Sequence, residues 1–434
     1  MQSHFPNSAA DRSRSGRTPQ PSSSDELGSL TLKPRLERGA ALGTNTSWAD
    51  TELFDSGTLL KLNMPARYSP ERERSIVLRA CLVILVGWVP LLLLTAYQSF
   101  VLRDASIASF LSDFAAASRS LIAAPLLVLA EWMALPRLGV MALHFRESGV
   151  VSRDDDARFA AACSSTLRLR DSVVADIGLI ALAYITIVAL KQVVPISLYP
   201  AWHVSSVAGV EVYSPAGWWH VLVSLPLLFV LLLGWIWRVL LWTRFLYLMA
   251  RLDLRLVPAH PDRTAGLRFV AYSVQAFWLV AFALGAIVAG SAANRVLYRG
   301  ASADTFTFDV VAVVATVIVV FAAPLLTLSG HLLRAWRRGT LQYSALAGRL
   351  GRQFEGKFFR DGTTIDASAL ELPDFSATTD LYQVASNVYE VRLVPISVVS
   401  LGILVGMAIL PFLAITLMFI PFDVIVEEIA KLLL

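Results

Sequence analysis

Long apolar stretches alternate along the chain with short polar connections that carry most of its arginines. Seven stretches are long enough to cross about 30 Å of hydrocarbon at roughly 1.5 Å per residue: residues 76–98, 118–139, 174–195, 219–242, 270–292, 308–330 and 394–420. Pro125, Glu131 and Pro136 interrupt the second stretch. A re-entrant or surface helix is therefore the alternative there, with six spans in total. The pattern predicts an all-α, polytopic transmembrane helix bundle of about seven spans with cytoplasmic amphipathic helices.

The distribution of lysine and arginine predicts the orientation of these spans. Segments 1–75, 140–173, 243–269 and 331–393 hold 28 of these residues, whereas 99–117, 196–218, 293–307 and 421–434 hold 4. Basic connections favour the cytoplasmic side of a membrane. Because the excess alternates at every span, it supports all seven together. We expect the N-terminus to be cytoplasmic and the C-terminus to be periplasmic.

The residues outside the spans fall into three kinds of segment. Residues 1–60 are rich in Ser, Pro, Gly and charged residues, which predicts a disordered cytoplasmic tail ahead of the six-span bundle 76–330. The cytoplasmic connection 331–393 reads as a basic amphipathic helix, an acidic break near Asp366, Glu371 and Asp374, and a second helix that leads to the last span, 394–420. This connection either lies on the inner leaflet or packs beneath the bundle. Residues 421–434 predict a short C-terminal amphipathic segment.

Composition removes several classes of protein. The chain of 434 residues is 56% hydrophobic and only 16% charged, whereas soluble domains carry about 25% charged residues. The net charge of +4 is concentrated in the predicted cytoplasmic loops, so it indicates anionic lipid and not nucleic acid. Cys81 lies in an apolar stretch and Cys163 in a basic loop, which predicts free thiols and not a disulfide framework.

Sequence motifs with a defined chemistry are absent. The chain has no G-x-x-x-x-G-K-[ST] loop, no H-E-x-x-H, no C-x-x-C pair and no G-x-S-x-G elbow. These absences exclude the usual P-loop ATPases, zincin proteases and serine hydrolases. We expect no metal ion and no cofactor.

The densest polar segment joins the fourth and fifth stretches. Pro258 and Pro261 restrict its backbone, and Gly266 frees it at one point. Its candidate ligand-binding residues stand just before a helix N-terminus, which favours anions: His260, Asp262, Arg263 and Arg268. The alternative is structural, with His260 and Asp262 capping helix ends or pairing with Arg263 or Arg268. In the first interpretation, Asp262 orients Arg263 toward a phosphate or a lipid headgroup.

A few ionisable residues fall inside the apolar stretches. Glu131 and Asp176 are the carboxylates that stand out, and both lie toward the predicted cytoplasmic side. A charge at the centre of a span costs roughly 2.5–3.5 kcal/mol on insertion scales, so it is usually paired or faces a cavity. We expect Glu131 to face the bundle interior and to pair with a cation, and a polar pocket shared with Arg79 or Arg238 is feasible. Unless such pairing occurs, Arg79 and Arg238 are interpreted as solvated ends that snorkel, and Asp176 as an interfacial residue.

Aromatic residues mark both ends of the fourth stretch. Trp218, Trp219 and His220 begin it, and Trp235, Trp237 and Trp242 crowd its other end. Tryptophans concentrate at membrane interfaces. We therefore interpret both groups as interfacial belts.

Several short segments carry a resemblance to a known family. They are Ala123 to Glu131, Arg170-Asp171-Ser172, His260-Pro261-Asp262-Arg263 with Gly266-Leu267, Leu341 to Lys357, Asp374 to Leu381, and Arg392 to Pro395. Over residues 75–434 the chain resembles an uncharacterised family of bacterial multi-pass inner-membrane proteins with a His-Pro-Asp-Arg-x-x-Gly-Leu cytoplasmic loop. Ala265 departs from the family pattern, which has a second glycine there. The resemblance implies a bacterial inner membrane and no particular reaction.

Three functions follow from these patterns. A transporter or channel-like role stands first, and a continuous polar cavity would favour it. A membrane sensor or assembly partner acting through 331–393 is the alternative, and a closed bundle with an exposed cytoplasmic platform would favour that. A membrane-embedded enzyme on lipid-linked substrates is the third, and it would need a pocket that gathers His260, Asp262 and a carboxylate. The expected partners are the lipid bilayer, anionic lipid at the basic loops, and a protein bound through 331–393.

Overall fold

The computed structural model describes residues 70–102, 105–196, 199–207, 210–299, 303–358 and 373–419. The tail predicted for residues 1–60 and the amphipathic segment predicted for 421–434 lie outside the described residues. Asp366 and Glu371 of the predicted acidic break also lie outside them.

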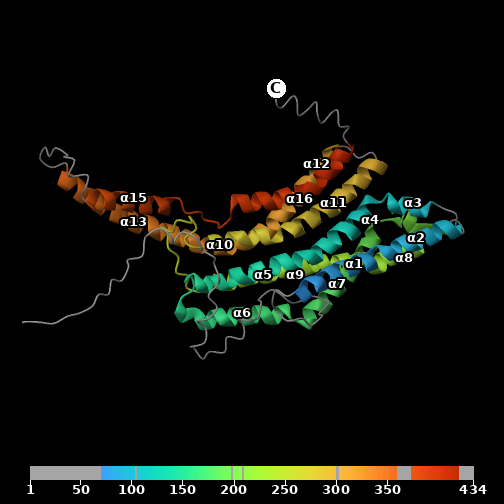
Figure 1. The fold of residues 1–434 in the computed structure, drawn as a ribbon, viewed down its shortest axis with the longest axis horizontal. Coiled ribbons are helices and arrows are strands. Elements are labelled where there is room, and N and C mark those ends of the chain that lie inside the picture. Colours follow the sequence, from blue (N-terminus) through green and yellow to red (C-terminus); the bar gives the residue numbers. More distant parts are fainter. Residues whose placement is uncertain are drawn as a thin grey trace, which may run out of the picture. The chain divides into compact units, whose positions relative to one another are not determined.

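Among the described residues, seven helical stretches are long and apolar enough to cross a membrane, which confirms the predicted fold class and span count. They are Arg74–Val101, Phe114–Glu147, Val173–Val193, Pro215–Met249, Arg268–Tyr298, Thr307–Phe358 and Val398–Thr416 (Figure 1).

These stretches are built from shorter elements. The first half of the described chain contains α1 (Pro70–Gly87), α2 (Val89–Leu102), α3 (Ser106–Leu111), α4 (Phe114–Ala117), η1 (Ser118–Ala123), α5 (Ala124–Glu147), η2 (Arg153–Asp155), α6 (Asp156–Arg170) and α7 (Val173–Val193). A short segment follows with η4 (Ala201–His203), β1 (Val204–Val207) and β2 (Val210–Tyr213). The second half contains α8 (Pro215–Trp219), η5 (His220–Ser224), α9 (Leu225–Met249), α10 (Arg268–Ala271), η6 (Tyr272–Phe277), α11 (Trp278–Arg299), α12 (Ala303–Ala322), η7 (Ala323–Leu328), α13 (Ser329–Phe358), α15 (Pro373–Tyr389) and α16 (Val398–Phe419).

The second span is a core helix and not a surface segment. Half of its apolar window, 50%, is buried inside the protein, compared with 11% for the third span. Its helix α5 packs against α1, α9 and α11. Pro125 lies just after the π-helical turn η1, and the helix continues through Pro136. The low hydropathy of this span reflects burial within protein, where polar groups can find partners.

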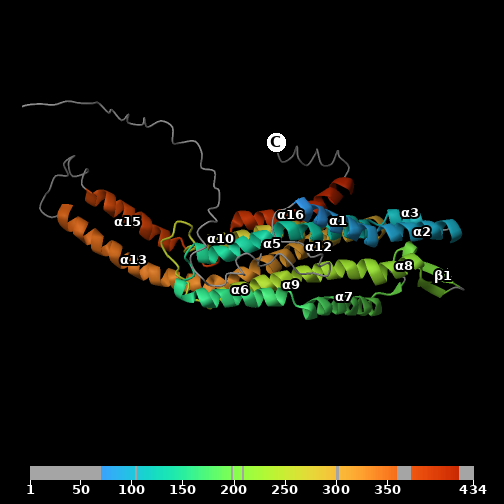
Figure 2. The same cartoon turned by 60° about the horizontal axis from the view of Figure 1, so that its bottom comes forward.

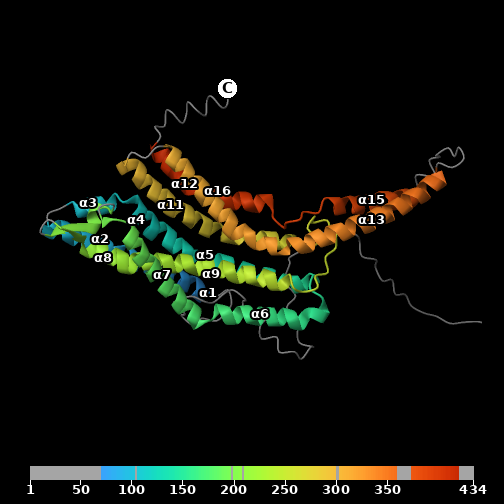
Figure 3. The same ribbon diagram turned by 180° about the vertical axis from the view of Figure 1, so that it is seen from behind.

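Small residues set the packing of the last three spans. Helices α11, α12 and α16 contact one another (Figure 3). A Cβ atom placed on Gly285 of α11 would lie 2.1 Å from the carbonyl oxygen of Ala408 in α16. Such close backbone approach is the common way for transmembrane helices to associate, because lipid removes the hydrophobic driving force between them.

One helix extends well beyond any bilayer. The stretch Thr307–Phe358 contains 52 residues, or about 78 Å of helix. Its distal part, α13, packs against α15 in an antiparallel pair (Figure 2). We call this pair the helical hairpin. Leu341 and Leu346 on α13 are exposed despite their helical spacing.

Helix α6 also lies outside the candidate spans, and it packs on α9. The basic loop expected around Cys163 is therefore a helix, and Cys163 is fully buried in it, while Cys81 is exposed. Burial raises the pKa of the Cys163 thiol to about 12. Both cysteines are free thiols.

Candidate functional site

A buried carboxylate joins three spans near the middle of the bundle. Glu131 on α5 accepts a hydrogen bond from Arg238 on α9, with 2.7 Å between Nη2 and Oε1. Its second oxygen, Oε2, lies 3.6 Å from Nη1 of Arg79 on α1. Glu131 is 9% exposed and Arg238 is 6% exposed. We call Arg79, Glu131 and Arg238 the charged triad.

The charged triad decides between the two interpretations of its arginines in favour of pairing with Glu131. Arg238 is buried because Glu131 pairs with it directly and because the ring of Trp235 lies 5.0 Å from the guanidinium carbon. Arg79 is half-buried, and its Nε has no hydrogen-bond partner among the described residues. Asp176, the other candidate, lies in the first turn of α7 after the N-cap Ser172. The helix dipole stabilises a negative charge at that position.

A second polar cluster lies beyond the N-terminal end of α5. His203 of η4 and His220 of η5 are both buried, and 2.6 Å separates Nε2 of His203 from Nδ1 of His220. The indole of Trp202 stacks on His203 with 3.7 Å between ring centroids. We call Asp113, Arg119, Trp202, His203 and His220 the histidine cluster.

Asp113 organises this cluster through three donors. Its Oδ1 accepts hydrogen bonds from the backbone N–H of Ala116 at 2.8 Å and from Nδ2 of Asn294 at 2.7 Å. Its Oδ2 accepts one from Nε1 of Trp202 at 3.0 Å. Asp113 thereby caps α4 and ties it to α11 and to η4. The local fold also demands a glycine, because a Cβ atom on Gly217 would lie 2.3 Å from the carbonyl oxygen of His203.

Burial dominates the electrostatics of His203. It lowers the pKa of His203 to about 3, with the negative charge of Asp113 opposing the shift and the positive charge of Arg119 adding to it. The imidazole of His203 is therefore neutral at ordinary pH. Its Nδ1 has no hydrogen-bond partner among the described residues.

Two cavities flank the histidine cluster. One, of about 330 Å³, is lined by Ser109, Ser112, Asp113, Pro200, Ala201, Asn294 and Tyr298. The other, of about 10 Å³, is lined by Val83, Gly87, Arg119, Ser120, Ala124, His220, Ser224, Leu225, Leu227 and Leu228. Arg119 and His220 reach the smaller cavity from η1 and η5, which are both π-helical turns. Such turns occur frequently at functional sites.

Burial corrects the interpretation of the aromatic residues as interfacial belts for His220, Trp235 and Trp242. His220 is 4% exposed and belongs to a polar core, while Trp218 is 46% exposed. At the far end of α9, Trp235 and Trp242 are buried in the bundle. Nε1 of Trp235 donates to the carbonyl oxygen of Leu127 at 3.0 Å, so neighbouring protein replaces the lipid headgroups as its polar partner.

The loop at His260 to Arg268 is ordered around the carboxylate of Asp262. This carboxylate accepts hydrogen bonds from the backbone N–H groups of Thr264, Gly266 and Arg268, at 2.8 to 3.1 Å. Partial burial alone would raise the pKa of Asp262, but these three donors lower it overall. The carboxylate of Asp262 therefore occupies the backbone N–H groups that an external anion would need as donors.

The partner of Arg263 differs from the expected one. Its Nε lies 2.9 Å from Oε2 of Glu390, and its carbonyl oxygen accepts a hydrogen bond from the N–H of Arg392. Asp262 contacts His260 instead, with 2.9 Å between Oδ1 and Nδ1. Ala265 has a left-handed backbone with φ of 55°. This conformation explains why glycine suits that position and why alanine there carries a conformational cost.

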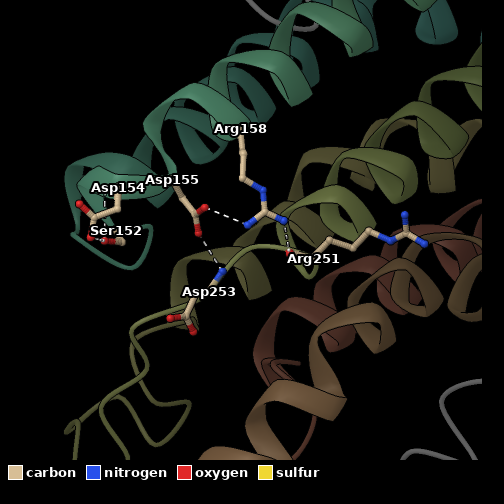
Figure 4. A network of polar contacts seen from close by, with 6 residues as sticks. All are labelled: Ser152, Asp154, Asp155, Arg158, Arg251 and Asp253. Carbon is tan, nitrogen blue, oxygen red and sulfur yellow. Dashed lines mark hydrogen bonds and ion pairs between the residues drawn. The ribbon is translucent and has the colours of Figure 1, made fainter.

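Further contacts fasten the first part of the same connection, between α9 and His260, to the start of α6. Oδ2 of Asp155 accepts a hydrogen bond from the N–H of Asp253 at 3.0 Å, and Oδ1 pairs with Arg158 at 2.9 Å (Figure 4). Arg158 also donates to the carbonyl oxygen of Arg251 at 3.0 Å. The bond from Asp253 is the main cause that lowers the pKa of Asp155. These contacts support the structural interpretation of the loop.

Comparison with known proteins adds no name to this geometry: no family model, no curated protein and no solved structure matches the chain. The resemblance to a family of bacterial inner-membrane proteins therefore stays a prediction. The function is therefore inferred from the charged triad and the histidine cluster.

Proposed function

We propose that this protein is a bacterial inner-membrane transporter or channel-like protein for small ions or solutes. The observation that carries the proposal is the burial of charged and titratable side chains at two depths of the bundle. The charged triad lies on α1, α5 and α9, and the histidine cluster lies at η1, η4 and η5. Ionisable groups within spans are costly and commonly mark the path of an ion or substrate.

Helix α5 contributes residues to the smaller cavity beside the histidine cluster and to the charged triad. On α5, Ala124 lines the smaller cavity and Glu131 belongs to the charged triad, a separation of about 10 Å along the helix. Leu127 and Val128 are buried between them. No residue of the charged triad lines either of these two cavities. We interpret this arrangement as a closed state in which an apolar layer separates two polar stations.

The proposed orientation places the charged triad and the helical hairpin toward the cytoplasm and the histidine cluster toward the periplasm. The alternation of basic connections supports a cytoplasmic N-terminus and a periplasmic C-terminus. Reporter fusions at Leu434 and at Asp113 should both report the periplasm. A cytoplasmic signal at either position contradicts this orientation.

Transport is tested with the full chain purified into liposomes. Vesicles that contain a pH-sensitive dye and a chloride-sensitive dye are placed in a gradient of each ion in turn. We expect faster equilibration of at least one ion than in protein-free vesicles. Glu131→Gln should slow it at least about tenfold, which corresponds to 1.4 kcal/mol of lost stabilisation. Glu147→Gln, the same substitution at an exposed site on α5, should leave the rate unchanged.

The result that contradicts transport is equally defined. Either wild-type protein equilibrates no solute faster than empty vesicles, or Glu131→Gln behaves as Glu147→Gln does. In the second case, Glu131 holds helices together and lies off any path.

Partner binding through the helical hairpin is the second candidate function. Leu341 is 73% exposed on α13, and Arg337 and Arg338 stand on the same extramembrane helix, which fits an acidic protein surface. A photoreactive residue at Leu341 should capture a protein in cells, whereas one at Val174, 80% exposed on the third span, should capture lipid. Capture of lipid at Leu341 contradicts this role. The enzyme alternative gains no support, since His260 and Asp262 line neither cavity.

A further inference from the structure

The smaller cavity presents a cation without a direct anionic partner. Arg119 lines this cavity, and its Nε is buried with no hydrogen-bond partner among the described residues. Asp113 interacts with Arg119 electrostatically, yet the ion pairs of the described residues include none between them. The donors of Ala116, Asn294 and Trp202 occupy the carboxylate of Asp113 instead.

A guanidinium inside a span is stable only when something satisfies its donors. Leaving a buried charge without a direct partner costs several kcal/mol in other proteins. Arginine has five N–H donors and no acceptor, so the missing partner must accept hydrogen bonds. A negative charge also makes such bonds shorter and stronger than a neutral acceptor does.

The other groups around the cavity fit the same partner. His220 lines it beside Arg119 and Ser120. Nδ1 of His220 contacts His203, so when His203 donates that hydrogen bond, the proton of His220 resides on Nε2 and is available as a second donor. Oγ of Ser224 donates to the carbonyl oxygen of Gly87 at 2.8 Å, which leaves Ser120 as the remaining hydroxyl of the lining.

Size restricts the partner further. The free volume of about 10 Å³ is close to what one water molecule requires. A phosphate group or a lipid headgroup is far larger; a chloride ion is the smallest common anion of biological fluids that fits this chemistry, and it too requires the lining to move outward. The apolar residues Val83, Leu227 and Leu228 complete the wall, which favours a weakly hydrated, singly charged ion.

We propose that the cavity between α1, η1 and η5 is a binding site for a small monovalent anion of chloride size, held by Arg119 with His220 and Ser120. This inference rests on the proposed transport function. It names the class of ion that binds in the smaller cavity beside the histidine cluster.

The test is anion-dependent stability of the full chain in detergent. Chloride is titrated against gluconate at constant ionic strength, and Tm is followed together with the line width of the chloride NMR signal. Wild type should show a saturable rise in Tm and a broadened signal. Arg119→Gln should weaken chloride binding about tenfold or more, while Arg137→Gln, an exposed arginine on the same helix, should bind as wild type does.

A second variant guards against misfolding of Arg119→Gln. Ala124→Val keeps Arg119 and narrows the cavity, so it should also abolish the chloride-dependent part of Tm. Chloride binding that persists in both variants overturns the proposal. So does a wild type that is indifferent to chloride, as expected if water fills the cavity, or one stabilised through Arg119 by phosphatidylglycerol and not by chloride.

Failure of this inference and failure of transport are distinguishable. Chloride binding in detergent without any flux in liposomes refutes transport alone. Flux that depends on Glu131, without chloride binding at Arg119, refutes the anion site alone.

Discussion

The two buried clusters solve the problem of charge in a membrane in different ways. In the charged triad, the carboxylate of Glu131 contacts the guanidinium groups of Arg238 and Arg79 directly. In the histidine cluster, the carboxylate of Asp113 is occupied by neutral donors, and Arg119 faces a cavity. The charge of Glu131 is therefore compensated within the protein, whereas Arg119 has no direct anionic partner among the described residues and lines a cavity.

This difference separates the energetics of the two clusters. Removing one member of a direct buried pair leaves the other charge without compensation. Arg119 is half-buried and its Nε has no hydrogen-bond partner among the described residues, so removing it leaves no opposite charge without its direct partner. Substitutions in the charged triad should therefore lower stability as well as flux, whereas substitution of Arg119 should mainly weaken anion binding.

The largest expected effect comes from Arg238→Met. It should lower the free energy of unfolding in detergent by about 3–5 kcal/mol, because it leaves Glu131 with Arg79 alone. Arg119→Met, measured in gluconate, should cost under about 1 kcal/mol by comparison. Adding Glu131→Gln to Arg238→Met should recover part of the loss. Equal losses for the two single variants would erase the distinction between the clusters.

A smaller effect is expected from Gly217→Ala. The new Cβ atom would clash with the carbonyl oxygen of His203, so the backbone of the histidine cluster must shift, at about 1–3 kcal/mol. Gly178→Ala on α7 meets no atom within 4 Å and provides the matched control. Thermal unfolding compares the two variants. A neutral Gly217→Ala would mean that the histidine cluster is not held rigidly.

Acidification provides a graded test of the histidine cluster. Because the folded-state pKa of His203 is lowered to about 3, the unfolded chain binds a proton near pH 6.5 while the folded chain does not. Stability should fall as pH drops below about 6.5 and continue to fall toward the folded pKa. The charged groups around His203 are Asp113, Arg119 and His220. His203→Gln should flatten the profile of Tm against pH; an unchanged profile assigns the effect to other groups.

The smallest effect is expected at the loop. The ion pair of Arg263 with Glu390 is about half exposed on both sides, and such pairs contribute roughly 0–1 kcal/mol. Arg263→Ala should therefore change Tm little and leave chloride binding and flux intact. If Arg263→Ala instead weakens binding of vesicles containing phosphatidylglycerol while the fold is retained, the loop is an anion site as its sequence first suggested.

The spans could be predicted from the sequence because apolar length alone determines what can cross a bilayer. Glu131 was identifiable as a residue that requires a partner, and Arg79 and Arg238 were among its possible partners, but the sequence alone left them open as solvated ends. The histidine cluster was not predictable. Asp113 and His203 come from two different connections and His220 from the start of the fourth span, and folding alone brings them together. The tryptophans beside them resemble an interfacial belt until burial distinguishes the two cases. At Ala265, the expected glycine points to a left-handed backbone that only the structure reveals.

The anion site at Arg119 is tested most directly by a structure determined from crystals soaked in bromide, an anomalous scatterer that replaces chloride. We expect a bromide peak in the smaller cavity, within hydrogen-bond distance of the Arg119 guanidinium. This peak should be absent in Arg119→Gln, and no peak should appear beside the charged triad. An empty or water-filled cavity with Arg119 paired to Asp113, or a bromide ion bound beside Arg238 instead, would contradict the proposed anion site.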